Sequence, residues 1–245
     1  MTINILIPIA GNSSFFAEDE YPYPKPLIDV CGKMMIEHVV DNYSMITGEK
    51  RFIFVIKSSD CDKYHLDDVL RLVSNHKCKI VKIDNETKGA ACSAIMAIKY
   101  INNKYPLIIA NADQTLDVDM NLILKEVGQY DGGVISFNSA HPRWSYARLN
   151  KDNFIVETSE KRPISNHAIA GFYFFSKGSE FVKGAMSMIR KDANIEGLYY
   201  VAPVFNEMIL KRKKIKTIMI DNDKYHTFYT PNKIKEFERN NLLLS

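Results

Sequence analysis

Residues 3–14 read INILIPIAGNSS, and this stretch decides the fold class. Apolar side chains fill almost every position from Ile3 to Ile9, which is typical of a strand buried on both faces of its sheet. Small residues follow from Ala10 and Gly11 onward, so the strand leaves the sheet through a small-residue loop. Strands of this kind belong mostly to parallel sheets that helices cover on both sides. The stretch therefore predicts an α/β fold.

Strand and helix patterns alternate along the rest of the first half. Strands are predicted at 51–56, 78–83 and 106–110, and helices at 34–43, 63–73 and about 90–100. In the second half, strands are predicted at 133–137, 145–149, 154–157, 168–175 and 215–220, with helices at 181–190, 201–211 and from 231 onward. This alternation predicts a parallel sheet that helices cover on both faces. No linker rich in Pro, Gly or Ser divides the chain, so we expect a single domain over residues 1–245.

The composition excludes several classes of protein. The chain has 245 residues, of which 46% are hydrophobic and 25% charged, so it is neither disordered nor collagen-like. Its net charge of +3 gives no reason to expect nucleic acid or an anionic membrane as partner, whereas a small anionic substrate fits. The four cysteines lack C-x-x-C spacing, and no run of 18 apolar residues occurs. We therefore expect a cytoplasmic protein with reduced thiols and no membrane insertion.

Three loops that follow predicted strands should meet in one crevice, because the carboxyl ends of parallel strands lie at one edge of the sheet. They span residues 11–25, 87–91 and 111–114. Lys25 stands between two prolines, where its ammonium can bind phosphate or, if the prolines only shape a crossover, face water. Asp113 directly follows an apolar strand, where it can hold a divalent cation or cap a turn.

Two further segments are candidates. The loop at Gly89 and Ala90 begins a predicted helix whose first N–H groups can face a phosphate, or which simply starts there. Glu160 and Lys161 end a predicted strand, either as part of a site or as a solvated turn. The six histidines show no metal-ligand spacing, and no base partner is identifiable for Ser13, Ser14 or the cysteines. Zinc hydrolysis and covalent nucleophilic catalysis are therefore unsupported.

Taken in order, these motifs resemble those of the bacterial sugar-1-phosphate nucleotidyltransferases over about residues 3–220. The segments that carry the resemblance are IPIAG at 7–11, PKPLI at 24–28, GK at 32–33, TKGA at 87–90, NADQ at 111–114, EKRP at 160–163 and GFY at 171–173. The chain is most similar to the branch found in capsule and surface-polysaccharide gene clusters, through P-x-WSY at 142–146 and YVAP at 200–203.

The resemblance implies a Rossmann-like, mixed, mostly parallel sheet flanked by helices, of the nucleotide-diphospho-sugar transferase type. It also implies an Mg²⁺-dependent reaction. In it, a substrate phosphate attacks the α-phosphorus of an NTP and pyrophosphate leaves. About 1–130 would be the nucleotide-binding half and about 131–245 the acceptor-binding half. The resemblance assigns Ala10, Gly11, Asn12, Lys25, Gly89, Ala90 and Asn111 to the nucleotide, Lys25 and Asp113 to catalysis, Asp113 to the metal, and Glu160, Lys161, Gly171 and Glu196 to the acceptor. It also admits a homo-oligomer.

The chain departs from the family pattern at three positions. Phe15 stands where the first loop usually carries an arginine, and Thr227 stands where many members have a late aspartate, with Asp221 or Asp223 as substitutes out of register. Leu198 replaces an acidic residue of the acceptor loop, with Glu196 nearby. The last change makes a non-sugar acceptor, such as a small phosphorylated alcohol, more expected than for an average member of the family. CTP would be the donor in that case, although the base is otherwise open.

The leading interpretation is a nucleotidyltransferase that joins an NTP to a phosphorylated sugar or small phosphorylated alcohol for capsular or surface-polysaccharide biosynthesis. One alternative is a glycosyltransferase of similar fold that uses an NDP-sugar, with Asp117 and Asp119 as its acidic metal motif. A second is a non-catalytic homologue that binds nucleotide or sugar phosphate, which the phenylalanine at position 15 favours.

Overall fold

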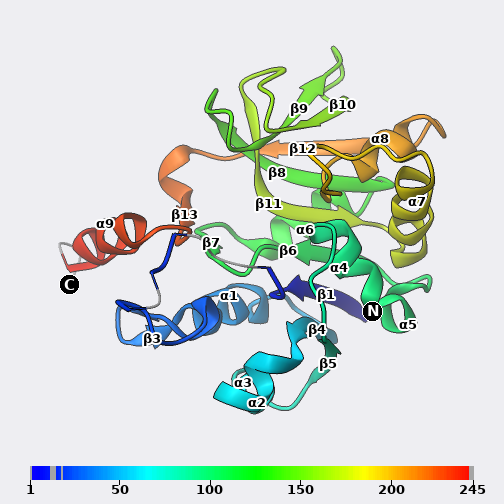
Figure 1. Ribbon diagram of the computed structural model, residues 1–245. Coiled ribbons are helices and arrows are strands. Elements are labelled where there is room, and N and C mark those ends of the chain that lie inside the picture. Colours follow the sequence, from blue (N-terminus) through cyan, green and yellow to red (C-terminus); the bar gives the residue numbers. More distant parts are fainter. Residues whose placement is uncertain (1, 12–14, 18, 243–245) are drawn as a thin grey trace.

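A computed structural model describes residues 2–11, 15–17 and 19–242 (Figure 1). The strands are β1 Ile3–Pro8, β2 Asp29–Val30, β3 Lys33–Met34, β4 Lys50–Lys57, β5 Cys78–Ile83, β6 Leu107–Ala110, β7 Gln114–Leu116, β8 Gly132–Asn138, β9 Ser145–Leu149, β10 Ile155–Glu160, β11 His167–Phe175, β12 Ile215–Met219 and β13 Tyr225–Thr227. The helices are α1 Met35–Ser44, α2 Ser58–Tyr64, α3 Leu66–Val73, α4 Ala90–Met96, α5 Ile98–Ile101, α6 Met120–Val127, α7 Gly178–Arg190, α8 Val204–Ile209 and α9 Pro231–Leu242, with 3-10 turns at Lys25–Leu27 and Asn222–Lys224.

The central sheet is mixed, as predicted. Its strands follow the order β10-β9-β11-β6-β1-β4-β5, and β8 adds to β11 and carries β12. β1 pairs in parallel with β4 on one side and with β6 on the other, and β5 pairs in parallel with β4. β11 runs antiparallel to β6, β8 and β9. The chain thus builds outward from β1 to β5 and then returns to place β6 on the opposite side of β1.

Helices cover both faces of the sheet because the side chains of β1 alternate between two cores. Ile5 and Ile7 pack in the core that includes α1, α3 and α6, whereas Leu6 packs in the core that includes α4, α5, α7 and α8. All three side chains are fully buried. Among the described residues, no helix combines the length and the apolar composition needed to cross a bilayer.

The structure corrects several predicted elements. The helix expected at 63–73 is two helices, because His65 adopts a left-handed conformation (φ 52°) that ends α2. The helix expected at 90–100 breaks at Ala97, between α4 and α5. The strands β7 and β13 and the helix α6 were not predicted; β7 and β13 have three residues each and form a sheet of their own.

A bulge in β11 brings its backbone against the turn that follows β6. The register of β11 against β8 shifts between Ile169 and Tyr173, and Gly171 inside this shift has φ +56°. A Cβ atom there would overlap with side-chain atoms of Asn111 and Gln114. Gly171 is therefore required twice, by its backbone conformation and by the close approach.

Gly171→Ala should lower the free energy of unfolding by about 2–4 kcal/mol, since it adds steric overlap to the cost of a positive φ. Gly197→Ala is the matched control, because Gly197 also has a positive φ (+78°) but no atom lies within 4 Å of its Cβ position. It should cost only about 1 kcal/mol. Urea unfolding of both variants measures the difference. An equal decrease in the free energy of unfolding would show that the side chains of Asn111 and Gln114 move aside without cost.

Candidate functional site

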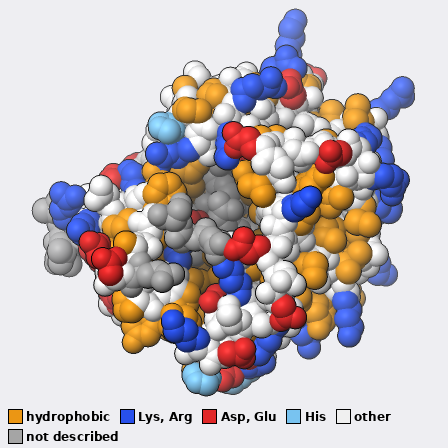
Figure 2. Space-filling model, in the orientation of Figure 1, with side chains coloured by type: hydrophobic (Ala, Val, Ile, Leu, Met, Phe, Trp, Pro, Cys, Tyr) orange, Lys and Arg blue, Asp and Glu red, His pale blue; other side chains and the backbone are white. Residues whose placement is uncertain are grey.

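The candidate site lies where the strand order reverses, at the carboxyl ends of β1 and β6. Adjacent parallel strands whose connections leave in opposite directions create a crevice at this point. The loop after β1 leads to the 3-10 turn at Lys25–Leu27, and the loop after β6 contains Asn111 and Asp113. Figure 2 shows that the molecular surface is hollowed near the middle of this face.

Lys25 and Asp113 form an ion pair across this crevice. The Lys25 ammonium donates to Oδ2 of Asp113, and each side chain is only about one-fifth exposed (21% and 23%). Nζ of Lys25 also lies 5.6 Å from the centre of the Phe16 ring. The two prolines beside Lys25 place it at the start of the 3-10 turn, so its position is set by the backbone. The structure therefore brings together the two residues expected to be catalytic.

A buried amide holds the turn that carries Asp113. Gln114, which is 1% exposed, donates from Nε2 to the carbonyl of Ala170 (2.5 Å) and accepts at Oε1 from the Tyr225 hydroxyl (3.1 Å) and from Nδ2 of Asn111 (3.3 Å). The Asn111 N–H donates to the carbonyl of Gly171 (3.1 Å). Gly171 thus supports this turn, and it is not among the described residues that line the groove discussed below.

Gly89 permits a main-chain contact between distant segments. It has φ +98°, and a Cβ atom there would lie 2.5 Å from the carbonyl oxygen of Tyr199. The Tyr199 N–H donates to the carbonyl of Lys88 (2.8 Å), and the Ala91 N–H donates to the carbonyl of Tyr199 (3.0 Å). One of the N–H groups expected to face a ligand is therefore bonded within the protein, while Ala90 beside it is exposed.

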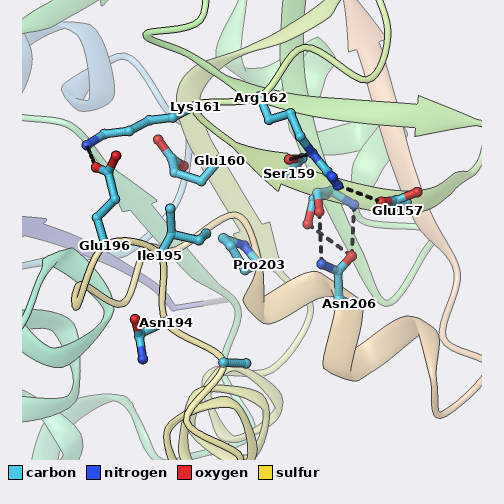
Figure 3. Close-up of a pocket in the computed structure, with 12 residues that line it drawn as sticks. Glu157, Ser159, Glu160, Lys161, Arg162, Asn194, Ile195, Glu196, Pro203 and Asn206 are labelled. Atoms are coloured by element: carbon cyan, nitrogen blue, oxygen red, sulfur yellow. Dashed lines mark hydrogen bonds and ion pairs between the residues drawn. The ribbon is translucent and has the colours of Figure 1, made fainter.

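A groove with a volume of about 520 Å³ lies at the end of β10 (Figure 3). It is lined by β10 and the residues after it, by residues 193–196, and by Pro203 and Asn206. Nζ of Lys161 lies 2.8 Å from Oε2 of Glu196, and Glu160 lies beside this pair in Figure 3. The hydrogen bond raises the pKa of Lys161 and lowers that of Glu196. We call this cavity the β10 groove; it gathers three of the four residues expected to contact the acceptor.

Glu160 is the most perturbed acid of the β10 groove. Burial raises its pKa from 4.5 to about 7, although the hydrogen bond from the Ser145 hydroxyl and the charge of Lys161 act in the opposite direction. Ser145 also lies 3.5 Å from the hydroxyl of the buried Tyr173. At neutral pH this carboxyl group is thus partly protonated and can donate as well as accept a hydrogen bond.

The β10 groove and the Lys25–Asp113 pair involve different residues. β9 and β11 lie between β10 and β6 in the sheet, so the groove flanks the crevice and does not include it. Tyr173 on β11 lies between the two: its backbone pairs with Ile109 of β6, and its hydroxyl approaches Ser145 of β9. Neither Lys25 nor Asp113 lines the β10 groove.

The remaining expected residues are placed as follows. Ala10 is buried and Gly11 exposed at the end of β1, and Asn12 lies outside the described residues. Thr227 pairs with Gln114 in the β7–β13 ladder, directly beside the Asp113 turn. Asp221 and Asp223 precede β13, whose first residue pairs with Leu116, so they lie toward the end of the ladder away from Asp113 and do not replace the missing acid.

The acidic motif considered for a glycosyltransferase has other uses. Asp119 caps α6 by accepting from the N–H groups of Asn121 (2.8 Å) and Leu122 (3.4 Å), and Asp117 lies 3.0 Å from His226. No cluster of three or more His, Cys, Asp or Glu side chains within the described ranges can hold a metal ion. Asp113 alone can still serve Mg²⁺, which commonly takes one or two carboxylates and completes its shell with water and substrate phosphates.

Comparisons with known proteins agree with this architecture. The nucleoside-diphosphate-sugar pyrophosphorylase of Vibrio cholerae RC9 has a similar structure, with a TM-score of 0.85 and 22% identity over 96% of this chain and 99% of that one. A UDP-glucose pyrophosphorylase complexed with UDP-glucose gives a TM-score of 0.78 with 15% identity over 100% of both chains. The chain therefore has the fold of the nucleotide-diphospho-sugar transferases.

One curated relative is detected by sequence. The bifunctional protein GlmU of Methanocaldococcus jannaschii is 26% identical over 158 residues, which are 63% of this chain. The matched region is 35% of that protein, so the chain spans about a third of the length of this relative. No family model matches the chain.

The raised pKa of Glu160 makes stability depend on pH. Because the folded protein holds this proton more tightly, the stabilisation is complete below pH 4.5 and is lost as the pH rises to about 7. Urea unfolding at pH 5 and pH 8 should therefore show Glu160→Gln gaining up to about 3 kcal/mol relative to the unmodified protein at the higher pH. Glu126→Gln, on the exposed face of α6, is the control. A constant difference between Glu160→Gln and the unmodified protein would contradict the raised pKa.

Proposed function

We propose that this protein is a nucleotidyltransferase that joins an NTP to a phosphorylated sugar or a small phosphorylated alcohol and releases pyrophosphate. The observation that carries the proposal is the Lys25–Asp113 pair at the strand-order reversal of a sheet with the nucleotide-diphospho-sugar transferase fold. The comparisons contribute the fold, and the reaction follows from the chemistry of the residues at its crevice. Residues 1–130 supply most of the nucleotide side and residues 131–245 most of the acceptor side.

The reaction needs positioning and charge neutralisation more than covalent chemistry. An oxygen of the acceptor phosphate attacks the α-phosphorus of the NTP, and the bond from the α-phosphorus to the bridging oxygen of the β-phosphate breaks. Lys25 binds the phosphates, and Asp113 would hold an Mg²⁺ ion, which would neutralise phosphate charge. Because Lys25 and Asp113 are already paired, both side chains are in place before the substrate phosphates bind to Lys25.

The β10 groove is suited to the acceptor. Lys161 can bind the acceptor phosphate, which then competes with Glu196 for the ammonium. Glu160, partly protonated at neutral pH, can exchange hydrogen bonds with a hydroxyl group. Leu198 follows the groove residues 193–196, and its side chain cannot form a hydrogen bond with a sugar hydroxyl. This supports a small phosphorylated alcohol as a second class of acceptor, with CTP as donor. A role in capsular or surface-polysaccharide biosynthesis follows from the motif resemblance.

Incubation with each NTP, MgCl₂ and a panel of sugar 1-phosphates and phosphorylated alcohols tests the reaction. Pyrophosphate should be released with one class of acceptor and depend on the presence of Mg²⁺. A coupled pyrophosphate assay measures this directly. Silence with all NTPs across the panel would contradict the proposed function.

Lys25→Ala and Asp113→Ala should each reduce kcat/KM by about 10²–10³-fold, because each removes a charged group that acts on the transferred phosphates. Lys33→Ala is the matched control, since Lys33 forms an ion pair with Asp41 (2.9 Å) in which both side chains are more than half exposed. It should retain full activity. Equal activity of all three variants would show that the crevice at β1 and β6 is not the site.

A further inference from the structure

Arg143 lies on the loop between β8 and β9. Its guanidinium group contacts two aromatic rings but makes only one side-chain hydrogen bond within the described part of the chain. Its Cζ atom lies 4.4 Å from the centre of the Tyr229 ring and 5.8 Å from that of Trp144. Its Nε donates to Nδ1 of His141 (3.3 Å). The terminal nitrogens Nη1 and Nη2 have no hydrogen-bond or ion-pair partner within the described part of the chain. These are the atoms with which arginine binds carboxylate or phosphate in a bidentate manner.

The neighbours of Arg143 hold the loop in place. The Tyr146 hydroxyl donates to the carbonyl of His141 (2.5 Å), and Ser145 donates to Glu160. The Trp144 ring packs against Phe137 (5.4 Å between centroids) and Tyr225 (5.7 Å). The segment singled out in the sequence as P-x-WSY is thus anchored at each position from 144 to 146, and Arg143 projects from a supported loop.

The ring under Arg143 is connected to both loops of the crevice. Tyr229 contacts Phe15 (5.7 Å between centroids), which lies in the loop between β1 and Lys25. The residue before it, Phe228, donates its N–H to the carbonyl of Asp113 (2.7 Å). Arg143 therefore stands over the segment that joins the two loops of the Lys25–Asp113 site.

The charges at the site give Arg143 a distinct role. Lys25 is neutralised by Asp113, and Lys161 is neutralised by Glu196. Arg143 has no carboxylate partner among the described residues, so it can take an anion without breaking an ion pair. Arg143 is exposed, but its contact with the Tyr229 ring restricts the guanidinium group, which lowers the entropy lost when it binds an anion.

We propose that Arg143 binds a phosphate oxygen of the substrates at the Lys25–Asp113 crevice. The inference rests on the proposed function for the identity of the substrates. The contact with the loop of Phe15 favours the NTP phosphates over the acceptor phosphate. No covalent step is involved; the guanidinium supplies charge-assisted hydrogen bonds in the ground state and in the transition state.

The chain itself provides a probe, because Trp144 is its only tryptophan and lies beside Arg143. Inorganic tripolyphosphate, each NTP and glucose 1-phosphate can therefore be titrated in separate arms while tryptophan emission is recorded. Calorimetry under the same conditions gives the dissociation constant independently of fluorescence. Neither measurement requires turnover, so loss of this contact is distinguished from failure of the proposed reaction.

Arg143→Ala should weaken tripolyphosphate and NTP binding about tenfold, and Arg143→Lys should weaken it less, because charge is kept while the bidentate geometry is lost. Arg71→Ala is the matched control: Arg71 lies on α3 and pairs with Asp67 and Asp68, none of which lines the β10 groove. It should bind as the unmodified protein does. A loss of affinity restricted to glucose 1-phosphate would overturn the assignment of Arg143 to the NTP phosphates. Unchanged affinity of Arg143→Ala for every probe would overturn the inference.

Discussion

The position of β1 between two parallel partners governs the rest of the structure. With β4 on one side and β6 on the other, β1 cannot be exposed at either edge, and its side chains must fill cores on both faces. The same placement forces the chain to cross back over the sheet before β6. The loops after β1 and β6 then end next to each other, although Lys25 and Asp113 are 88 residues apart. The site is therefore a consequence of strand order.

The sequence was sufficient for features that depend on local patterns. The buried strands are apolar runs, so β5 and β9 were predicted to the residue. Asp113 became a candidate because it follows such a run. Features that depend on distant contacts were not accessible. Nothing in the sequence around Gly171 reveals that β11 presses against the β6–β7 turn. The role of Gln114 likewise depends on Tyr225, from a strand too short to produce a periodic pattern.

Charge is balanced within the site in the absence of substrate. The ion pair of Lys25 with Asp113 lowers the cost of placing isolated charges in partly buried surroundings, whereas the pair of Lys161 with Glu196 is largely exposed. Under the proposed function, an anionic substrate would exchange for these partners and would not leave Lys25 or Asp113 as an isolated charge. A near-neutral chain can in this way serve a strongly anionic ligand, since its net charge of +3 says little about where individual cations are held.

The contact between Gly89 and Tyr199 has a consequence for how the two halves of the molecule can diverge. It is made by the main chain of Tyr199, and the segment that contains it also supplies Glu196 to the β10 groove. Side chains along this segment can therefore be exchanged to suit a different acceptor while the hydrogen bonds to Lys88 and Ala91 persist. The freedom is one-sided, because any larger residue at position 89 would meet the backbone of Tyr199. Under the proposed function, the acceptor could therefore change through side chains of this segment, provided that position 89 remains glycine.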